Sequence, residues 1–356
     1  MPNVGKSTLF NCLSNAKAQA ANFPFCTIEP NIGVINVPDE RLEVLAKLVN
    51  PQKIVPATVE IVDIAGLVKG ASKGEGLGNQ FLGNIRECDA ILHVLRCFDD
   101  PNVIHVEGSV HPLRDKEIID IELQLKDFET VEKRLARVSK AAKAGNDKDA
   151  KKELDILNAY YKVLSEQKSA RNVVLSPEDK ILVQDLHLLT DKPVLYVCNV
   201  DQSSLKGNKY TDAVKEAVKG ENAEVLLIDA GIEAEITQLE SADDRKAFLD
   251  EMGLDEPGVN KLIKAAYKLL NLSTYFTAGE MEVRAWTIHK GDKAPQAAGV
   301  IHTDFEKGFI KAEVIAYEDF VKYGSESACR DVGKLMIQGK DYVMKDGDVV
   351  HFRFNV

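Results

Sequence analysis

The sequence lacks several features, and each absence argues against a class of protein. Its six cysteines are scattered and include no C-x-x-C pair, which argues against both a zinc ribbon and a disulfide framework. No apolar run approaches the roughly 20 residues needed to cross a bilayer. No signal-peptide pattern is visible at the N-terminus, and internal repeats and low-complexity linkers are missing. We therefore expect a globular, cytoplasmic protein with no membrane partner.

Excess positive charge is also missing from the chain as a whole. The 45 Lys and Arg residues against 56 Asp and Glu residues leave a net charge of −11, so a protein that is basic throughout is excluded. Between Glu132 and Arg171, however, 11 basic residues face only 6 acidic ones. This local excess predicts either a surface for RNA phosphates or a solvated helical face, and few aromatic residues accompany it for base stacking.

Short apolar runs alternate with helical patterns along the first two thirds of the chain. A helix is predicted from Ser7 to Ser14, and another from Arg41 to Val49 with Asp39 as its N-cap. Strand–helix alternation predicts an α/β fold whose parallel sheet carries sites at the carboxyl ends of its strands. The expected strands cover residues 32–37, 55–64, 90–95, 194–198 and 225–228.

Two segments depart from this alternation. Residues 118–168 are helical and charged, with a break at 145–147, which predicts an antiparallel helical hairpin inserted in the α/β domain. The last 80 or so residues carry strand patterns and Gly-Asp turns, which predict a small α+β module starting near Thr274. The strands of this module are expected at residues 282–287, 309–315 and 349–354.

The most informative motif stands at the beginning of the chain. Gly5-Lys6-Ser7 matches the end of the phosphate-binding pattern G-x-x-x-x-G-K-[ST], whose first glycine and preceding strand would come before Met1. In such a loop, backbone N–H groups and the helix dipole bind phosphates, Lys6 reaches the β- and γ-phosphates, and Ser7 holds Mg²⁺. The alternative is a plain helix start. The residues expected to bind nucleotide here are Asn3, Val4, Gly5, Lys6, Ser7 and Thr8.

A second phosphate motif, Asp63-Ile64-Ala65-Gly66, follows an apolar strand. Here Asp63 is expected to bind Mg²⁺ through water, and the N–H of Gly66 to sense the γ-phosphate. Leu67 follows, where many GTPases have a glutamine that orients water, so slow hydrolysis is predicted. Six glycines between Gly66 and Gly83 predict a switch segment. Thr27 lies where a first switch would supply a Mg²⁺ ligand, although a plain loop threonine fits as well.

The residues that follow the strand at 194–198 should determine which base the protein binds. A guanine-binding N-K-x-D motif is replaced there by Asn199-Val200-Asp201-Gln202, which lacks the final carboxylate. This favours adenine or weak discrimination, with Asn199, Val200 and Ala230 as the expected base contacts. His105, in the loop after the strand at residues 90–95, is either the group that orients or deprotonates water or a structural histidine.

Together these motifs resemble the YchF-type Obg-like ATPases, a branch of the translation-factor-related P-loop NTPases. The resemblance covers essentially the whole chain and is most specific at residues 2–10, 21–30, 63–83 and 274–279. It implies a P-loop domain at 1–272, an inserted helical hairpin at 118–172, and a β-grasp (TGS) domain at 273–356. It also implies Mg²⁺-dependent hydrolysis of ATP to ADP and phosphate, and association with the ribosome.

The resemblance bears on individual residues as well. It implies a catalytic role for His105, together with Lys6 and Gly66, and Mg²⁺ ligation by Ser7, Thr27 and Asp63. Two features depart from the family: Gln202 replaces a glutamate in N-x-x-E, and the family pattern begins earlier, which predicts a truncated start. The alternatives are an Obg-related GTPase, or a nucleotide-gated ribosome- or RNA-binding regulator with little hydrolysis. No DNA partner is expected.

Overall fold

The computed structural model describes residues 2–20, 32–64, 77–105, 107–144, 148–221 and 223–355. Thr27, Gly66 and Leu67 lie outside the described residues. The chain forms two compact units. The first consists mainly of residues 62–259 and the N-terminal residues up to Asn15, and the second of residues 34–61 and 260–355. The domain boundaries expected from the sequence stay a prediction.

The first unit contains a parallel sheet made from three of the five strands expected, whereas the other two, near residues 32–36 and 58–62, pair with each other in a separate sheet. The parallel sheet is formed by β4 (Ile91–Arg96), β5 (Val194–Asn199) and β6 (Glu224–Ile228) in that order, with every residue of β5 buried. Arg96 pairs with Asn199, and Asn199 with Ile228, so the three strands end at one edge. Besides the hairpin, this unit includes the helices α3 (Leu77–Glu87), α6 (Pro177–Val183), α7 (Lys209–Ala217), α8 (Ala230–Gln238) and α9 (Ala242–Met252).

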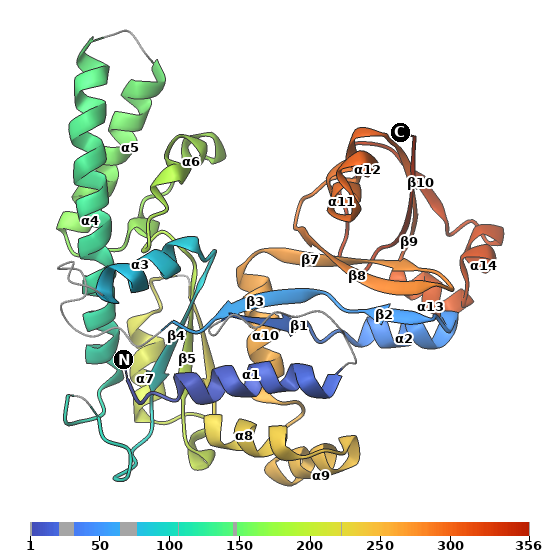
Figure 1. The fold of residues 1–356 in the computed structure, drawn as a ribbon, viewed down its shortest axis with the longest axis horizontal. Helices are drawn as coiled ribbons and strands as arrows, with labels where there is room; N and C mark the ends of the chain where they lie inside the picture. The colour runs from blue at the N-terminus through green and yellow to red at the C-terminus, as the bar shows by residue number, and fades with distance from the viewer. Residues whose placement is uncertain are drawn as a thin grey trace. The chain divides into compact units, whose positions relative to one another are not determined.

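The helical hairpin is confirmed. Helices α4 (Pro112–Ala144) and α5 (Lys148–Ser165) lie side by side, as Figure 1 shows. Buried Val131 on α4 and Leu157 and Tyr160 on α5 belong to one apolar core, and Arg134 Nε lies 2.6 Å from Glu153 Oε1. Helix α4 begins six residues before the expected Ile118, because Pro112 suits a first helical position where no N–H is needed.

Near the N-terminus, α1 (Lys6–Ala20) is longer than the helix expected, and α2 (Glu40–Val49) is capped by Asp39 as predicted. The strand expected at residues 55–64 is confirmed over residues 58–62, but its start is wrong. The structure has β2 (Lys53–Val55) and β3 (Thr58–Val62) instead, because Pro56 has no N–H for a strand ladder. Strand β3 pairs with β1 (Ile32–Asn36), whereas β2 pairs with a strand of the C-terminal module.

That module begins at β7 (Leu272–Ala278), close to the expected start. Its sheet has the order β10-β9-β11-β7-β8-β2, with β11 parallel to β7 and antiparallel to β9. Buried Tyr275 and Phe352 pack with alanines of α11 in its core, an arrangement expected of a β-grasp domain. The remaining elements are α10 (Gly258–Leu269), β8 (Glu282–His289), α11 (Ala294–Ile301), α12 (Thr303–Lys307), β9 (Phe309–Ile315), α13 (Tyr317–Tyr323), α14 (Glu326–Asp331), β10 (Met336–Gln338) and β11 (Val349–Phe354).

Within the described residues, no helix combines the length and the apolar character that crossing a bilayer requires.

Candidate nucleotide site

The loop before α1 has the backbone shape that a phosphate-binding turn needs. Asn3 and Gly5 both have positive φ angles, 57° and 88°. The carbonyl of Gly5 accepts the N–H of Leu9 at 3.0 Å, so α1 starts directly after Gly5. The first N–H groups of a helix have no acceptor within it, and they favour a bound anion.

Gly5 also leaves no room for a side chain. A Cβ atom built on Gly5 would lie 2.1 Å from Nδ2 of Asn199, well inside van der Waals contact. Two independent features therefore require glycine at position 5: its positive φ angle and the close approach of the Asn199 side chain.

Asn199, at the end of β5, joins the phosphate loop to the loop after β6. Its Nδ2 donates to the carbonyl of Val4 at 3.0 Å, and its Oδ1 accepts the N–H of Ala230 at 3.0 Å. Asn199 is buried, and Val200 belongs to the core around β5. Asn199, one of the residues expected to contact the base, thus holds two loops of the site together.

The two phosphate motifs meet. The Lys6 ammonium forms an ion pair with Oδ1 of Asp63, 57 residues away in sequence, and both side chains are partly buried. Ser7 and Thr8 are exposed in the first turn of α1. A cation, a carboxylate and a hydroxyl therefore stand at the helix N-terminus where a phosphate group would bind.

His105 lies in a loop that contacts the phosphate loop: the side-chain amide of Asn3 donates to the carbonyl of Ile104 at 3.1 Å. The His105 ring itself faces inward. Its Nε2 lies 2.8 Å from Oδ2 of Asp115, and its Nδ1 accepts the N–H of Glu107 at 3.1 Å. Both ring nitrogens are occupied here, and the catalytic role of His105 stays a prediction.

The loop after β5 offers no carboxylate in the place where a guanine-binding motif has one. Gln202 occupies that place, and its Nε2 contacts Sδ of Met252 at 3.4 Å. Asp201 accepts the hydroxyl of Ser203 at 2.6 Å, and this hydrogen bond lowers the pKa of Asp201. The carboxylate of Asp201 is therefore engaged within its own loop.

Sequence reasoning missed two charged residues behind the His105 loop. Arg96 is buried at the end of β4 and donates to the carbonyls of Phe98, Asp100 and Val103 at 3.2, 3.1 and 2.8 Å. Asp115, in the first turn of α4, is 1 % exposed. An arginine directly after an apolar strand was a usable signal for the first, whereas nothing local pointed to the second.

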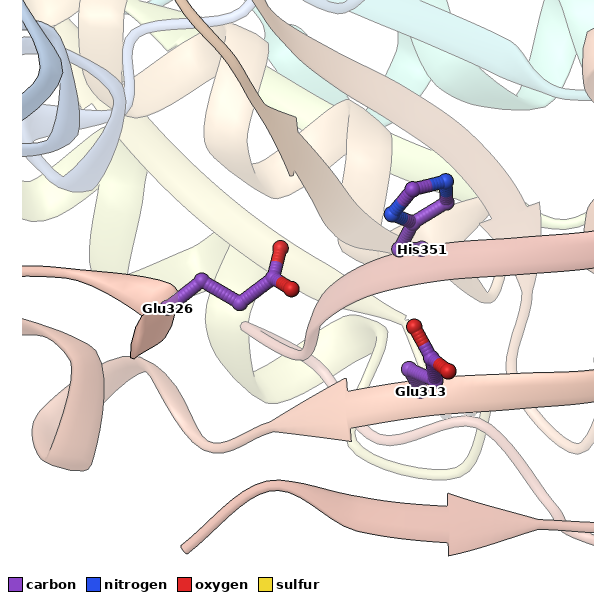
Figure 2. Close-up of side chains that lie close together, drawn as sticks. All are labelled: Glu313, Glu326 and His351. Carbon is purple, nitrogen blue, oxygen red and sulfur yellow. The ribbon is translucent and has the colours of Figure 1, made fainter. Parts of the chain in front are cut away.

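A separate group of possible metal ligands lies in the C-terminal module. Figure 2 shows Glu313 and His351 on neighbouring strands with Glu326 beside them, and one ligand atom from each lies within 4.8 Å of the others. The carboxylates already have cations: Lys311 and Arg353 lie 3.0 Å from Glu313, and Arg330 lies 2.6 Å from Glu326. We read this group as an ion-pair network and assign no metal to it.

Comparison with known proteins identifies the family. Residues 272–355 match the model of the YchF GTPase C-terminal region, described as a protein of unknown function, and residues 1–140 match that of the 50S ribosome-binding GTPases. The ribosome-binding ATPase YchF of Bacillus subtilis is 55% identical over 100% of this chain and 98% of its own length. The chain belongs to the YchF family. The YchF of Escherichia coli O157:H7 is also 55% identical, over the same shares of both chains.

Solved structures agree with this assignment. The YchF GTPase of Schizosaccharomyces pombe is 41% identical and superposes with a TM-score of 0.89 over 99% of this chain and 96% of its own. A GTP-binding protein of Pyrococcus horikoshii, 18% identical with a TM-score of 0.59, shares the fold and covers 99% of this chain and 98% of its own. The YchF fold predicted from the sequence motifs is thereby confirmed.

Proposed function

We propose that this YchF protein is a Mg²⁺-dependent ATPase that associates with the ribosome and changes conformation with the nucleotide it holds. The observation that carries this proposal is the contact between Lys6 and Asp63, because it joins two phosphate motifs at one helix N-terminus. The bacterial relatives that match this chain along its whole length bear the name ribosome-binding ATPase. A ribosome-associated protein of this kind acts in the cytoplasm.

The residues present fit a magnesium nucleotide. The glycine at position 5 leaves the backbone bare beside the helix N-terminus, and Ser7 and Asp63 offer the oxygen ligands that Mg²⁺ prefers. With Thr27, these residues would hold the ion, which neutralises charge on the β- and γ-phosphates when bound. The N–H groups from Asn3 to Thr8 bind the phosphates in this scheme.

Lys6 has a double role in the proposal. Lys6 pairs with Asp63, and nucleotide binding would exchange this ion pair for contacts with the β- and γ-phosphates. The N–H of Gly66 then reports the γ-phosphate, and His105 positions the attacking water. Because Leu67 cannot orient water, intrinsic hydrolysis is slow and a partner raises it.

Base preference follows from the missing carboxylate. Guanine needs a charged acceptor for its N1–H and its amino group, and Gln202 supplies none, so ATP is the favoured nucleotide. Calorimetric titrations with Mg-ATP and Mg-GTP test this, and we expect ATP to bind more tightly by about tenfold or more. Gln202→Asp should raise the affinity for GTP, whereas the matched variant Gln202→Asn should not.

A second candidate function is GTP hydrolysis. The 41% identical protein from Schizosaccharomyces pombe is described as a GTPase, which supports this reading. Tighter binding of GTP than of ATP in the paired titrations would establish it and remove the preference for adenine. Absence of binding for both nucleotides would overturn the proposal as a whole.

The hairpin is the proposed ribosome contact, reached through RNA phosphates. Several of its basic residues already have partners: Lys152 lies 2.5 Å from Asp179, and Lys133 lies 2.5 Å from Glu129. The exposed basic positions that best suit a test are Arg137 and Lys140 on α4 and Lys148 on α5.

Replacing Arg137, Lys140 and Lys148 together by glutamate should abolish co-sedimentation with ribosomes and leave ATP affinity unchanged. The same charge change at exposed positions elsewhere, Lys219, Lys246 and Lys290, is the control and should have a smaller effect on ribosome binding. Equal losses in the two triple variants would point to net charge and not to the hairpin.

A further inference from the structure

We infer that Asp115 is a positioning residue for hydrolysis, because its carboxylate decides which nitrogen of His105 can meet the attacking water. The inference rests on the proposed function, in which His105 acts on that water. It goes beyond that proposal by naming the group that orients the histidine and by fixing the tautomer in which it works.

The geometry around the imidazole fixes its proton. Nδ1 of His105 accepts the N–H of Glu107 at 3.1 Å, and a nitrogen that accepts an N–H carries no proton of its own. The proton of the neutral ring therefore sits on Nε2, which donates it to Oδ2 of Asp115 at 2.8 Å. The His105 side chain is 6 % exposed and that of Asp115 is 1 % exposed, so little water competes for this hydrogen bond.

Within the described residues, the hydrogen bond with His105 is the main contact of the Asp115 carboxylate. Its other oxygen accepts no hydrogen bond within the described part of the chain and lies 3.5 Å from Nη2 of Arg114. Asp115 lies in the first turn of α4, and a helix N-terminus is a favourable place for negative charge. From this place the Asp115 carboxylate can accept the Nε2–H of His105 throughout the reaction.

The loop that carries His105 is fixed on its other side as well. Arg96 binds three of its backbone carbonyls, at Phe98, Asp100 and Val103. The loop is thus held between a buried cation on β4 and a buried anion on α4. Neither residue belongs to the phosphate motifs.

This arrangement leaves Nδ1 as the base. Water takes the place of the Glu107 N–H at Nδ1 and gives its proton to that nitrogen while its oxygen attacks the γ-phosphorus. The bond from the γ-phosphorus to the bridging oxygen breaks, and its electron pair leaves on ADP. Asp115 stabilises the imidazolium formed in this step, and the proton then passes to the product phosphate or to solvent.

Single-turnover hydrolysis of Mg-ATP, with ATP affinity measured in parallel, tests the inference in wild type, His105→Ala, Asp115→Asn and the double variant. We expect Asp115→Asn to lower the hydrolysis rate about 10- to 100-fold with unchanged ATP affinity. In the His105→Ala background, the same change should have no further effect, because Asp115 acts through His105.

The outcomes distinguish a failure of the proposed role of His105 from a failure of the inferred role of Asp115. A normal rate for His105→Ala would remove the proposed role of the histidine itself. A slow His105→Ala with a normal Asp115→Asn would overturn the inference alone, and so would equal losses from Asp115→Asn in both backgrounds. Imidazole ¹⁵N spectra of the wild type add a test that needs no variant: a proton on Nδ1 of neutral His105 would contradict the assignment.

Discussion

Asp127 and Thr190 are joined by two hydrogen bonds, although they lie 63 residues apart in the sequence. The N–H and the hydroxyl of Thr190 both donate to Oδ2 of Asp127, at 2.7 and 2.6 Å. The other carboxylate oxygen accepts the N–H of Leu189 at 2.7 Å. Asp127 is completely buried on α4, so it anchors the first arm of the hairpin to the segment that leads into β5.

This anchor predicts a pH-dependent stability. Burial raises the pKa of Asp127 to about 6, against the pull of its hydrogen bonds with Thr190 and Leu189. The folded protein therefore holds this proton more tightly than the unfolded chain. The contribution of the carboxyl to the free energy of unfolding is full below about pH 4 and is lost as the pH rises through about 6.

Asp127→Asn removes the titration and leaves the amide with one acceptor for two N–H groups. We expect the variant to be less stable by about 1–3 kcal/mol near pH 4.5. The difference in the free energy of unfolding between wild type and variant should decrease by on the order of 2 kcal/mol towards pH 7.5, because only the wild type acquires the buried charge. Urea unfolding followed by circular dichroism measures both values. A difference that is independent of pH would contradict the assignment.

Gly5→Ala should disable the phosphate loop. The new Cβ would displace the Asn199 amide from the carbonyl of Val4, and alanine is strained at a φ of 88°. We expect ATP affinity to fall at least about tenfold, as measured by calorimetry. Gly253→Ala is the control, because Gly253 has a φ of 66° and no atom of the described residues lies within 4 Å of a Cβ built there. That variant should lose some stability and keep its ATP affinity.

Asn199→Asp should weaken ATP and GTP alike. The carboxylate can still accept the N–H of Ala230, but it cannot donate to the carbonyl of Val4 and brings a negative charge beside the phosphates. Because Asn199 holds the loop, the ratio of the two affinities should stay constant while both fall about tenfold. A selective loss of one nucleotide would show instead that Asn199 contacts the base.

Arg41→Met should destabilise the second unit. Nη1 of Arg41 lies 2.7 Å from Asp346, Nη2 lies 2.8 Å from Asp39, and the guanidinium stands 5.2 Å from the centre of the Phe276 ring. We expect a loss of about 1–3 kcal/mol in the free energy of unfolding. The fluorescence of Trp286, the single tryptophan, reports the unfolding of this unit.

Lys53→Met is the matched control for Arg41→Met. Lys53 is 58 % exposed and lies 3.8 Å from Glu282, a geometry that contributes about 0–1 kcal/mol at a protein surface. Equal losses from Lys53→Met and Arg41→Met would mean that the ion pairs and ring contact of Arg41 add nothing to stability.

Local patterns predicted the elements that have local causes. The strands at residues 309–315 and 349–354 have the bounds expected, because alternation and flanking turns define them. The cap at Asp39 was found for the same reason, since its side chain binds the N–H two residues further on. The motif residues Lys6 and Asp63 were brought together as their order in the chain implied.

Local sequence patterns could not predict contacts between segments that are distant in the sequence. Strand β2 joins the sheet of the C-terminal module through pairs such as Lys53 with Glu282, and no local signal selects that partner. Asp115 was missed because the helix was expected to begin at Ile118, three residues too late to include it. The double use of the Asn199 amide depends on three loops meeting, which the sequence motifs do not describe.

Helix α4 runs without a break from the His105 loop to the tip of the hairpin. Its 33 uninterrupted residues extend about 50 Å at 1.5 Å per residue. Asp127, which anchors α4, lies about 18 Å along the helix from Asp115 and about 25 Å from the end of the helix at Ala144. One continuous helix therefore connects the far end of the hairpin with the residue that hydrogen-bonds to His105.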